Sequence, residues 1–219
     1  MKEHHIEVPR SARYYTLGET GPDLRQVWIM RHGYGQPASQ FIRYFRVLDD
    51  GTRMLVAPEG LSRFYHNHTS GSVGASWMTK EDRLSEISDY VRYLGVLHDH
   101  IFEQVPRESV VLHVFGFSQG AATVSRWIER GSVAPERLTL WGGLMPQDVD
   151  LAVFRQRVAD TDFRIVLGEE DEYAEPELVQ AQETRLRQGA VQHSLIRFDG
   201  GHRLDKKVLR VLGELNQPL

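Results

Sequence analysis

A serine between two glycines is the residue of this chain best suited to do chemistry. Residues 116–120 read Gly-Phe-Ser-Gln-Gly, with Ser118 at the centre. A serine nucleophile must stand exposed at a tight turn between a strand and a helix, and small flanking residues allow the backbone to close that turn. The pattern therefore indicates nucleophilic catalysis by the Ser118 hydroxyl.

The segments around this turn match what such a nucleophile needs. A mostly apolar run over 110–115 reads as a buried strand, and Ala121, Val124 and Ile128 recur at helical spacing until Gly131 ends the helix. A serine between glycines is often only a turn, so the pattern is weak without its surroundings. With a strand before it and a helix after it, the catalytic interpretation is favoured.

Serine catalysis also needs a base that takes the hydroxyl proton, and two histidines follow Ser118 in the chain. His193 falls at or just before the last expected strand. His202 follows a glycine-rich turn beyond the carboxyl end of that strand, where open α/β sheets bind their ligands. We therefore predict that His202 is the base.

The acid that orients this base is expected after the strand over 163–167. That strand runs into Gly-Glu-Glu-Asp-Glu at 168–172, so charge alone leaves the choice open. Asp171 is preferred because a short aspartate three residues past the glycine can reach back to the histidine. Glu170 is the alternative, and Asp199 is more typical of a turn former.

An oxyanion needs two backbone N–H donors, and two segments can supply them. One donor is the residue after the nucleophile, Gln119; the other is Tyr34, in the Arg-His-Gly-Tyr-Gly loop over 31–35. Glycines at 33 and 35 permit a turn that directs the Tyr34 N–H into the site, and we expect His32 to brace this loop.

Short apolar runs alternate with amphipathic segments, which predicts one α/β domain over 1–219 with a mostly parallel sheet and helices on both faces. Helices are expected from Thr79, with Asp82 in a capping-box-like start, after Ser118, after Pro176, and from about 205 to 215. The stretch 59–76 is expected to be a long irregular loop with a function. Strands are expected at 14–17, 27–30, 54–57, 110–115, 138–141, 163–167 and 195–198.

Composition excludes several classes of protein. The 26 basic and 30 acidic side chains leave a net charge of −4, which does not favour a nucleic-acid partner. Without cysteine there is neither a disulfide nor a thiol nucleophile. We expect a cytoplasmic protein, because the first residues lack the apolar core of a signal peptide and no run is long enough for a membrane span.

Some residues invite a second role. Alternate histidines at 66–68 and 98–100 look like metal ligands, but on a helix such residues diverge around the surface, so no metal site is predicted. Phe64, Trp77 and Met145 are candidates for the wall of an acyl-binding pocket, because they lie near expected strand ends.

Four motifs together resemble the phospholipase/carboxylesterase family of small serine hydrolases, which includes the acyl-protein thioesterases. They are His-Gly-Tyr-Gly at 32–35, Gly-Phe-Ser-Gln-Gly-Ala-Ala at 116–122, Gly-Glu-Glu-Asp at 168–171 and Gly-His at 201–202. The resemblance implies an α/β-hydrolase fold, with Ser118 as nucleophile, Asp171 as acid, His202 as base, and Tyr34 and Gln119 as oxyanion donors. The loop after residue 35 lacks the acidic residue common in the family.

The expected function is cleavage of a small-molecule carboxylic ester through an acyl-enzyme, without a cofactor. A thioesterase acting on acyl-protein or acyl-CoA is the alternative, since the same groups serve both bonds. A catalytically silent binding protein with the same fold is a third possibility. The sequence does not choose between a monomer and a homodimer.

Overall fold

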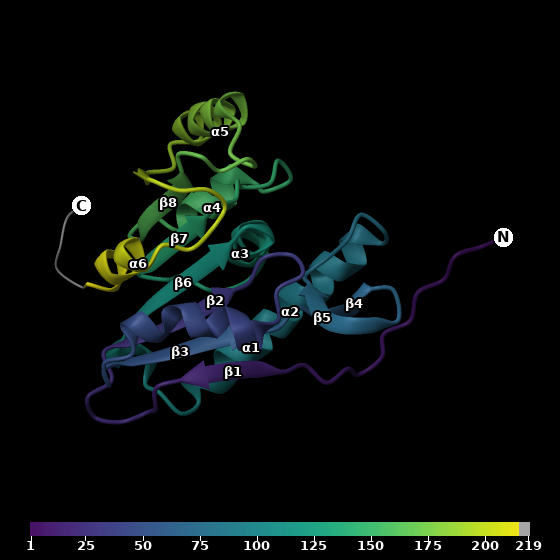
Figure 1. Ribbon diagram of the computed structural model, residues 1–219, viewed down its shortest axis with the longest axis horizontal. Coiled ribbons are helices and arrows are strands. Elements are labelled where there is room, and N and C mark those ends of the chain that lie inside the picture. The colour runs from purple at the N-terminus through teal and green to yellow at the C-terminus, as the bar shows by residue number, and fades with distance from the viewer. Residues whose placement is uncertain (215–219) are drawn as a thin grey trace.

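The computed structural model describes residues 1–214, and a seven-stranded sheet forms its centre (Figure 1). All neighbouring strands pair in parallel except β1 and β3, which are antiparallel. Every strand predicted from the sequence is present, with ends shifted by at most two residues. In spatial order the strands are β1 (Tyr14–Leu17), β3 (Arg53–Pro58), β2 (Gln26–Arg31), β6 (Val111–Phe117), β7 (Arg137–Trp141), β8 (Asp162–Gly168) and β9 (Ser194–Phe198).

The five inner strands of the sheet are largely buried on both faces, as continuous apolar strands predict. In β2, Val27 and Ile29 belong to one core, whereas Trp28 and Met30 belong to the other. One face is covered by α2 (Arg83–Phe102), α3 (Gln119–Arg130), α4 (Leu151–Arg157) and α5 (Pro176–Gln188). The opposite face is covered by α1 (Ala38–Phe41), the 3₁₀ helix η1 (Ile42–Leu48) and α6 (Lys206–Gly213) (Figure 1). The predicted α/β class is thereby confirmed.

The stretch 59–76 is not the irregular loop that we predicted. It contains β4 (Ser62–Asn67) and β5 (Ser70–Ser76), which pair antiparallel as a separate hairpin. Most of β4 is exposed and polar, so it lacks the apolar alternation that reveals a strand. Gly74 is required for close packing here, because a Cβ at that position would lie 2.8 Å from the Gly35 oxygen. The hairpin therefore packs tightly on the 32–36 loop.

One helix prediction needs correction, and several short helical segments were not predicted. Helix α2 begins at Arg83 rather than at Thr79, because Asp82 adopts a left-handed conformation with φ 44° and makes no side-chain cap. The α1, η1 and α4 segments were not predicted, and each is short. Helix α6 begins after Asp205, whose carboxylate accepts from the Lys207 and Val208 amides. The predicted end of this helix, Leu215, lies outside the described residues.

A further short 3₁₀ helix, η2 (Arg107–Ser109), leads into β6. Parallel pairing places the carboxyl ends of β2, β6, β8 and β9 along one edge of the sheet. The segments that follow these strands carry the predicted site residues, so the topology brings them together. Within residues 1–214, none of the helices is both long enough and apolar enough to cross a membrane.

Candidate active site

Ser118 occupies the sharp turn between β6 and α3 that its sequence predicts. Its backbone has φ 54° and ψ −118°, an unfavourable combination for a residue with a side chain, and its N–H donates to the Trp141 oxygen at 2.8 Å. A Cβ on Gly116 would lie 2.3 Å from the Gly120 oxygen, and one on Gly120 would lie 2.3 Å from the Arg31 oxygen. Both glycines are therefore required by backbone packing.

A continuous hydrogen-bonded chain joins the three predicted triad residues. The Ser118 Oγ lies 2.9 Å from His202 Nε2, and His202 Nδ1 lies 2.9 and 3.0 Å from the two carboxylate oxygens of Asp171. The Asp171 side chain is 1% exposed and the His202 side chain 18%. An imidazole that donates from Nδ1 to the carboxylate leaves the Nε2 lone pair free to take the serine proton.

The loops after β8 and β9 set the distance between acid and base. The Glu170 N–H donates to the Gly200 oxygen at 3.0 Å, and a Cβ on Gly168 would lie 2.1 Å from that oxygen, so the two loops are in close contact. The centroid of the His202 ring lies 4.9 Å from that of Phe117 and 4.6 Å from that of Tyr173. These two contacts restrict the rotation of the imidazole.

The alternatives considered for acid and base lie elsewhere. Glu170, Glu172 and Asp199 are exposed, and in the described chain Asp171 is the carboxylate that contacts His202. His193 hydrogen bonds through Nε2 to Glu183 at 2.8 Å, away from Ser118. The geometry thus favours the triad that the sequence suggested.

The loop over 32–36 places one backbone donor beside the nucleophile. A Cβ on Gly33 would lie 3.1 Å from the Ser118 Cβ, so the loop and the turn are in contact. The N–H groups of Gly33, Gly35 and Gln36 each donate to an acceptor, whereas the Tyr34 N–H has no hydrogen-bond partner among residues 1–214. Gln119 is the first residue of α3, and the first N–H of a helix has no partner within the helix.

His32 braces this loop, as expected. Its Nε2 accepts from the Gly60 N–H at 2.9 Å, so the ring hydrogen is on Nδ1, which donates to the Gly33 oxygen at 2.8 Å. The ring is fully buried, and burial lowers the pKa of His32 from 6.5 to about 4. The imidazole is therefore neutral near pH 7 and holds both hydrogen bonds.

The three residues suggested for the acyl pocket differ in exposure. Phe64 is half-buried and stacks on Tyr34 with ring centroids 5.2 Å apart. Trp77 and Met145 are only 2% and 3% exposed, which leaves them little surface for an acyl chain. Sequence analysis missed Tyr173, which is 65% exposed and lies beside His202. The signal that could have identified it is its position two residues after Asp171.

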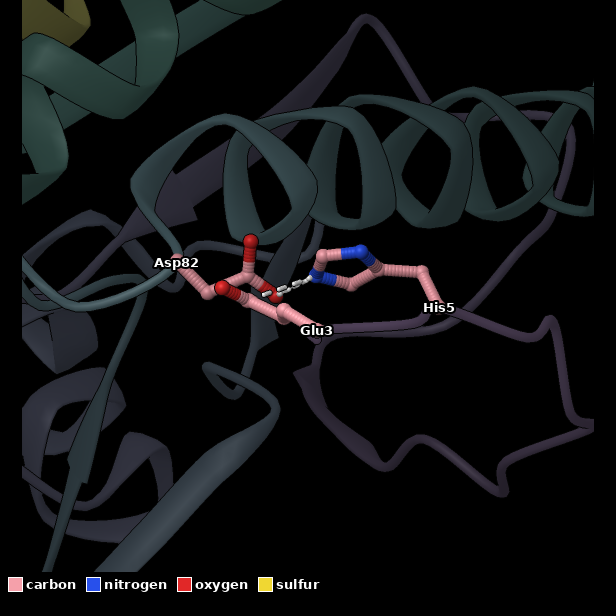
Figure 2. A group of neighbouring side chains, drawn as sticks. All are labelled: Glu3, His5 and Asp82. Atoms are coloured by element: carbon pink, nitrogen blue, oxygen red, sulfur yellow. Dashed lines mark ion pairs between the residues drawn. The ribbon is translucent and has the colours of Figure 1, made fainter. Parts of the chain in front are cut away.

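No histidine of the two sequence clusters joins a group of ligands in the described part of the chain. His66 Nε2 lies 3.0 Å from the Gly35 oxygen, and His98 pairs with its neighbour Asp99. One other group of three potential ligands occurs among residues 1–214, with His5 Nε2 3.3 Å from Glu3 and 3.2 Å from Asp82 (Figure 2). All three side chains are exposed, and ordinary surface ion pairing accounts for their proximity.

No family model matches the sequence, and no curated protein matches it either. Solved structures do match. A carboxylesterase from Mesorhizobium loti superposes with a TM-score of 0.70 at 16% identity over 92% of each chain. The acyl-protein thioesterase 2 of Zea mays gives 0.67 at 16% identity, over 92% of this chain and 98% of that one. This chain has the α/β-hydrolase fold.

Within this α/β-hydrolase fold, the similarity extends over almost the whole chain. A phospholipase/carboxylesterase from Dyadobacter fermentans superposes at a TM-score of 0.64 with 20% identity, over 94% of this chain and 97% of that one. The fold implied by the sequence resemblance is thereby confirmed. At such identities the comparison concerns the α/β-hydrolase fold alone, and the activity must be argued from the site.

Proposed function

We propose that this protein is a serine hydrolase that cleaves carboxylic esters through an acyl-enzyme intermediate. The observation that carries the proposal is the hydrogen-bonded chain from Asp171 through His202 to Ser118, with contacts of 2.9 to 3.0 Å. Two further features support it: the strained, glycine-packed turn at Ser118 and the unpartnered Tyr34 N–H beside it. Both features are expected of a nucleophile turn with an oxyanion hole beside it.

In the proposed reaction, His202 Nε2 takes the hydroxyl proton as the Ser118 Oγ attacks the ester carbonyl. The Asp171 carboxylate stabilises the imidazolium, and the oxyanion accepts hydrogen bonds from the Tyr34 and Gln119 N–H groups. Collapse of the tetrahedral intermediate releases the alcohol, which takes the proton from His202. A water molecule, deprotonated by His202, then attacks the acyl-enzyme, and the proton returns to the Ser118 Oγ as the acid leaves.

An active-site probe tests the nucleophile directly. A fluorophosphonate should form one adduct on the folded protein, and mass spectrometry should map it to Ser118. Ser118→Ala should take up no probe, and prior incubation with an ester substrate should slow labelling of the wild type. Absence of the adduct on folded wild-type protein, or an adduct at another residue, would refute the proposal.

The rim of the site favours an apolar acyl group. Tyr34 is 60% exposed and stacks on Phe64, and the exposed Tyr173 has its ring centroid 4.6 Å from that of His202. Exposed aromatic side chains next to polar catalytic groups are typical of a site that binds apolar ligands. We therefore expect small-molecule acyl esters as substrates, with Phe64 contacting the acyl chain.

A thioesterase is the second candidate, because the maize thioesterase and the M. loti carboxylesterase superpose on this chain almost equally well. The same triad can attack either bond. Rates on an oxygen ester and a thioester with the same acyl chain, measured side by side, decide between them. A kcat/KM for the thioester at least tenfold higher would replace the ester assignment.

A further inference from the structure

Trp77 hydrogen bonds to both of the segments that carry the proposed oxyanion donors. Its indole N–H donates to the His32 oxygen at 2.9 Å, and its backbone N–H donates to Gln119 Oε1 at 3.0 Å. His32 is two residues before Tyr34, and Gln119 is itself the second donor. A single residue thus connects two segments more than 80 positions apart in the sequence.

On the Tyr34 side, the contact with Trp77 is reinforced by stacking and by neighbouring bonds. The rings of Trp77 and His32 are stacked with centroids 5.0 Å apart. The Gly35 N–H donates to the Ala75 oxygen at 2.8 Å, two residues before Trp77. Ala75, near the end of β5, and Trp77, just after it, therefore hold the loop at residues on both sides of Tyr34.

On the other side, the Gln119 side chain has one orientation that satisfies its neighbours. Its Oε1 faces the Trp77 N–H, and its Nε2 donates to the Met78 oxygen at 2.7 Å and to Ser76 Oγ at 3.1 Å. Exchange of the amide oxygen and nitrogen would place donor against donor and acceptor against acceptor. This side chain therefore fixes the first turn of α3 to the segment 76–78.

We propose that Trp77 is a positioning residue that sets the separation of the Tyr34 and Gln119 N–H donors. The proposal rests on the proposed function. An oxyanion is stabilised only by donors placed about 2.7–3.1 Å from where it forms, so a small displacement of one donor reduces the rate. Trp77 does not contact the substrate; it acts through the two segments to which it hydrogen bonds.

Trp77→Phe tests the role most cleanly, because it removes the indole N–H and retains an aromatic ring and the backbone N–H. We expect kcat on a p-nitrophenyl ester to fall about 10- to 100-fold, less than the loss on removing a whole oxyanion donor. KM should change less than about threefold, since the substrate contacts remain. Melting temperature and circular dichroism show whether the variant is folded.

A thionoester substrate provides a readout that general destabilisation would not change. Sulfur is a weak hydrogen-bond acceptor, so a carbonyl sulfur gains less from the two donors than a carbonyl oxygen does. The ratio of kcat/KM for a matched ester and thionoester should therefore fall about tenfold in Trp77→Phe. Trp28→Phe is the control: it also loses a buried indole bond, to Gln26 Oε1 at 2.9 Å, and its ratio should equal that of the wild type.

Gln119→Met, which retains side-chain length without hydrogen-bonding groups, tests the other end of the bridge. Its ratio of kcat/KM for the ester to kcat/KM for the thionoester should also fall. In the double variant Trp77→Phe/Gln119→Met this ratio should fall by less than the product of the two single reductions, because both substitutions break the same connection. If Trp77→Phe is folded and its ratio equals that of the wild type, the proposal is wrong. Fluorophosphonate labelling of Ser118 separates the two hypotheses: labelling with an unchanged ratio contradicts the role of Trp77 alone, whereas no labelling contradicts the proposed function.

Discussion

The two sides of the site are built in different ways. On the Ser118 side, five consecutive residues make the turn, and its geometry depends on the absence of side-chain volume at Gly116 and Gly120. On the Tyr34 side, the N–H groups of Gly60 and the Trp77 indole donate to His32, and the Ala75 oxygen accepts from the Gly35 N–H. These partners lie 28 to 45 residues apart in the sequence. The Ser118 side depends on close backbone packing, within the turn at Gly116 and against the Arg31 oxygen at Gly120, whereas the Tyr34 side depends on hydrogen bonds between distant segments.

This difference indicates how each side should fail. A steric requirement is all-or-none, because an added Cβ at 2.3 Å from a carbonyl oxygen cannot be accommodated without moving the backbone. A set of hydrogen bonds can lose one member and keep the others, so the donor shifts rather than disappears. A side chain added at Gly116 or Gly120 should therefore reduce stability and activity together, whereas loss of one hydrogen bond to the 32–36 loop should reduce activity in steps.

Ser118→Ala provides the reference, because it removes the nucleophile without disturbing either side. We expect kcat on a p-nitrophenyl ester to fall about 10⁵- to 10⁶-fold. The melting temperature should stay the same or rise slightly, since the residue is half-buried and alanine fits its space. A kcat within tenfold of the wild type would contradict the nucleophile assignment.

Asp171→Asn should have the next largest effect. An amide in place of the carboxylate no longer fixes the reactive tautomer of His202 or stabilises its imidazolium, so kcat should fall about 10⁴-fold. The exposed carboxylates of the same region are matched controls, and Glu170→Gln, Glu172→Gln and Asp199→Asn should each cost less than about tenfold. An inactive Glu170→Gln beside an active Asp171→Asn would move the acid by one residue.

Gly120→Ala tests the steric side of the comparison. The new methyl group would overlap the Arg31 oxygen, just before the 32–36 loop. We therefore expect a loss of about 3 kcal/mol or more in the free energy of unfolding. Gly95→Ala in α2 is the control: no atom lies within 4 Å of its added Cβ, and it should stabilise the protein by about 0.5–1 kcal/mol. Urea denaturation of both variants gives the comparison, and an unchanged midpoint for Gly120→Ala would contradict the packing argument.

The pH dependence of stability tests the role of His32 in holding the 32–36 loop. His32 has its pKa lowered to about 4 in the folded protein, so between pH 6.5 and about 4 the unfolded chain binds more protons and stability falls as pH falls. Between pH 7 and 4.5 this contribution is about 2 kcal/mol. His32→Phe should be less stable than the wild type at pH 7. Between pH 7 and 4.5, however, its free energy of unfolding should fall by about 2 kcal/mol less than that of the wild type. Equal losses in urea titrations of the two proteins would show that His32 does not titrate with a lowered pKa.

Periodicity and motif spacing predicted the main elements of this molecule. The five inner strands of the central sheet are apolar runs that are largely buried on both faces, so their signal is strong. The β4–β5 hairpin was missed because its residues are mostly exposed and polar, and it gains its stability from packing on the 32–36 loop. Asp82 illustrates the limit at helix ends: a good capping residue by type adopts a left-handed conformation here.

The sequence by itself determined the turn around Ser118, because the glycines, the strand and the helix that make it are contiguous. It also placed His202 and a group of carboxylates after the right strands, since the ends of parallel strands share one edge. Sequence reasoning preferred Asp171 but left Glu170 open. Only the tertiary structure shows that Asp171 is the carboxylate in contact with His202, because this depends on which side chain the contact between the β8 and β9 loops directs inward. It likewise buried Trp77 and hydrogen bonded it to His32 and Gln119, since hydrogen bonds between distant segments leave no periodic signal in the sequence.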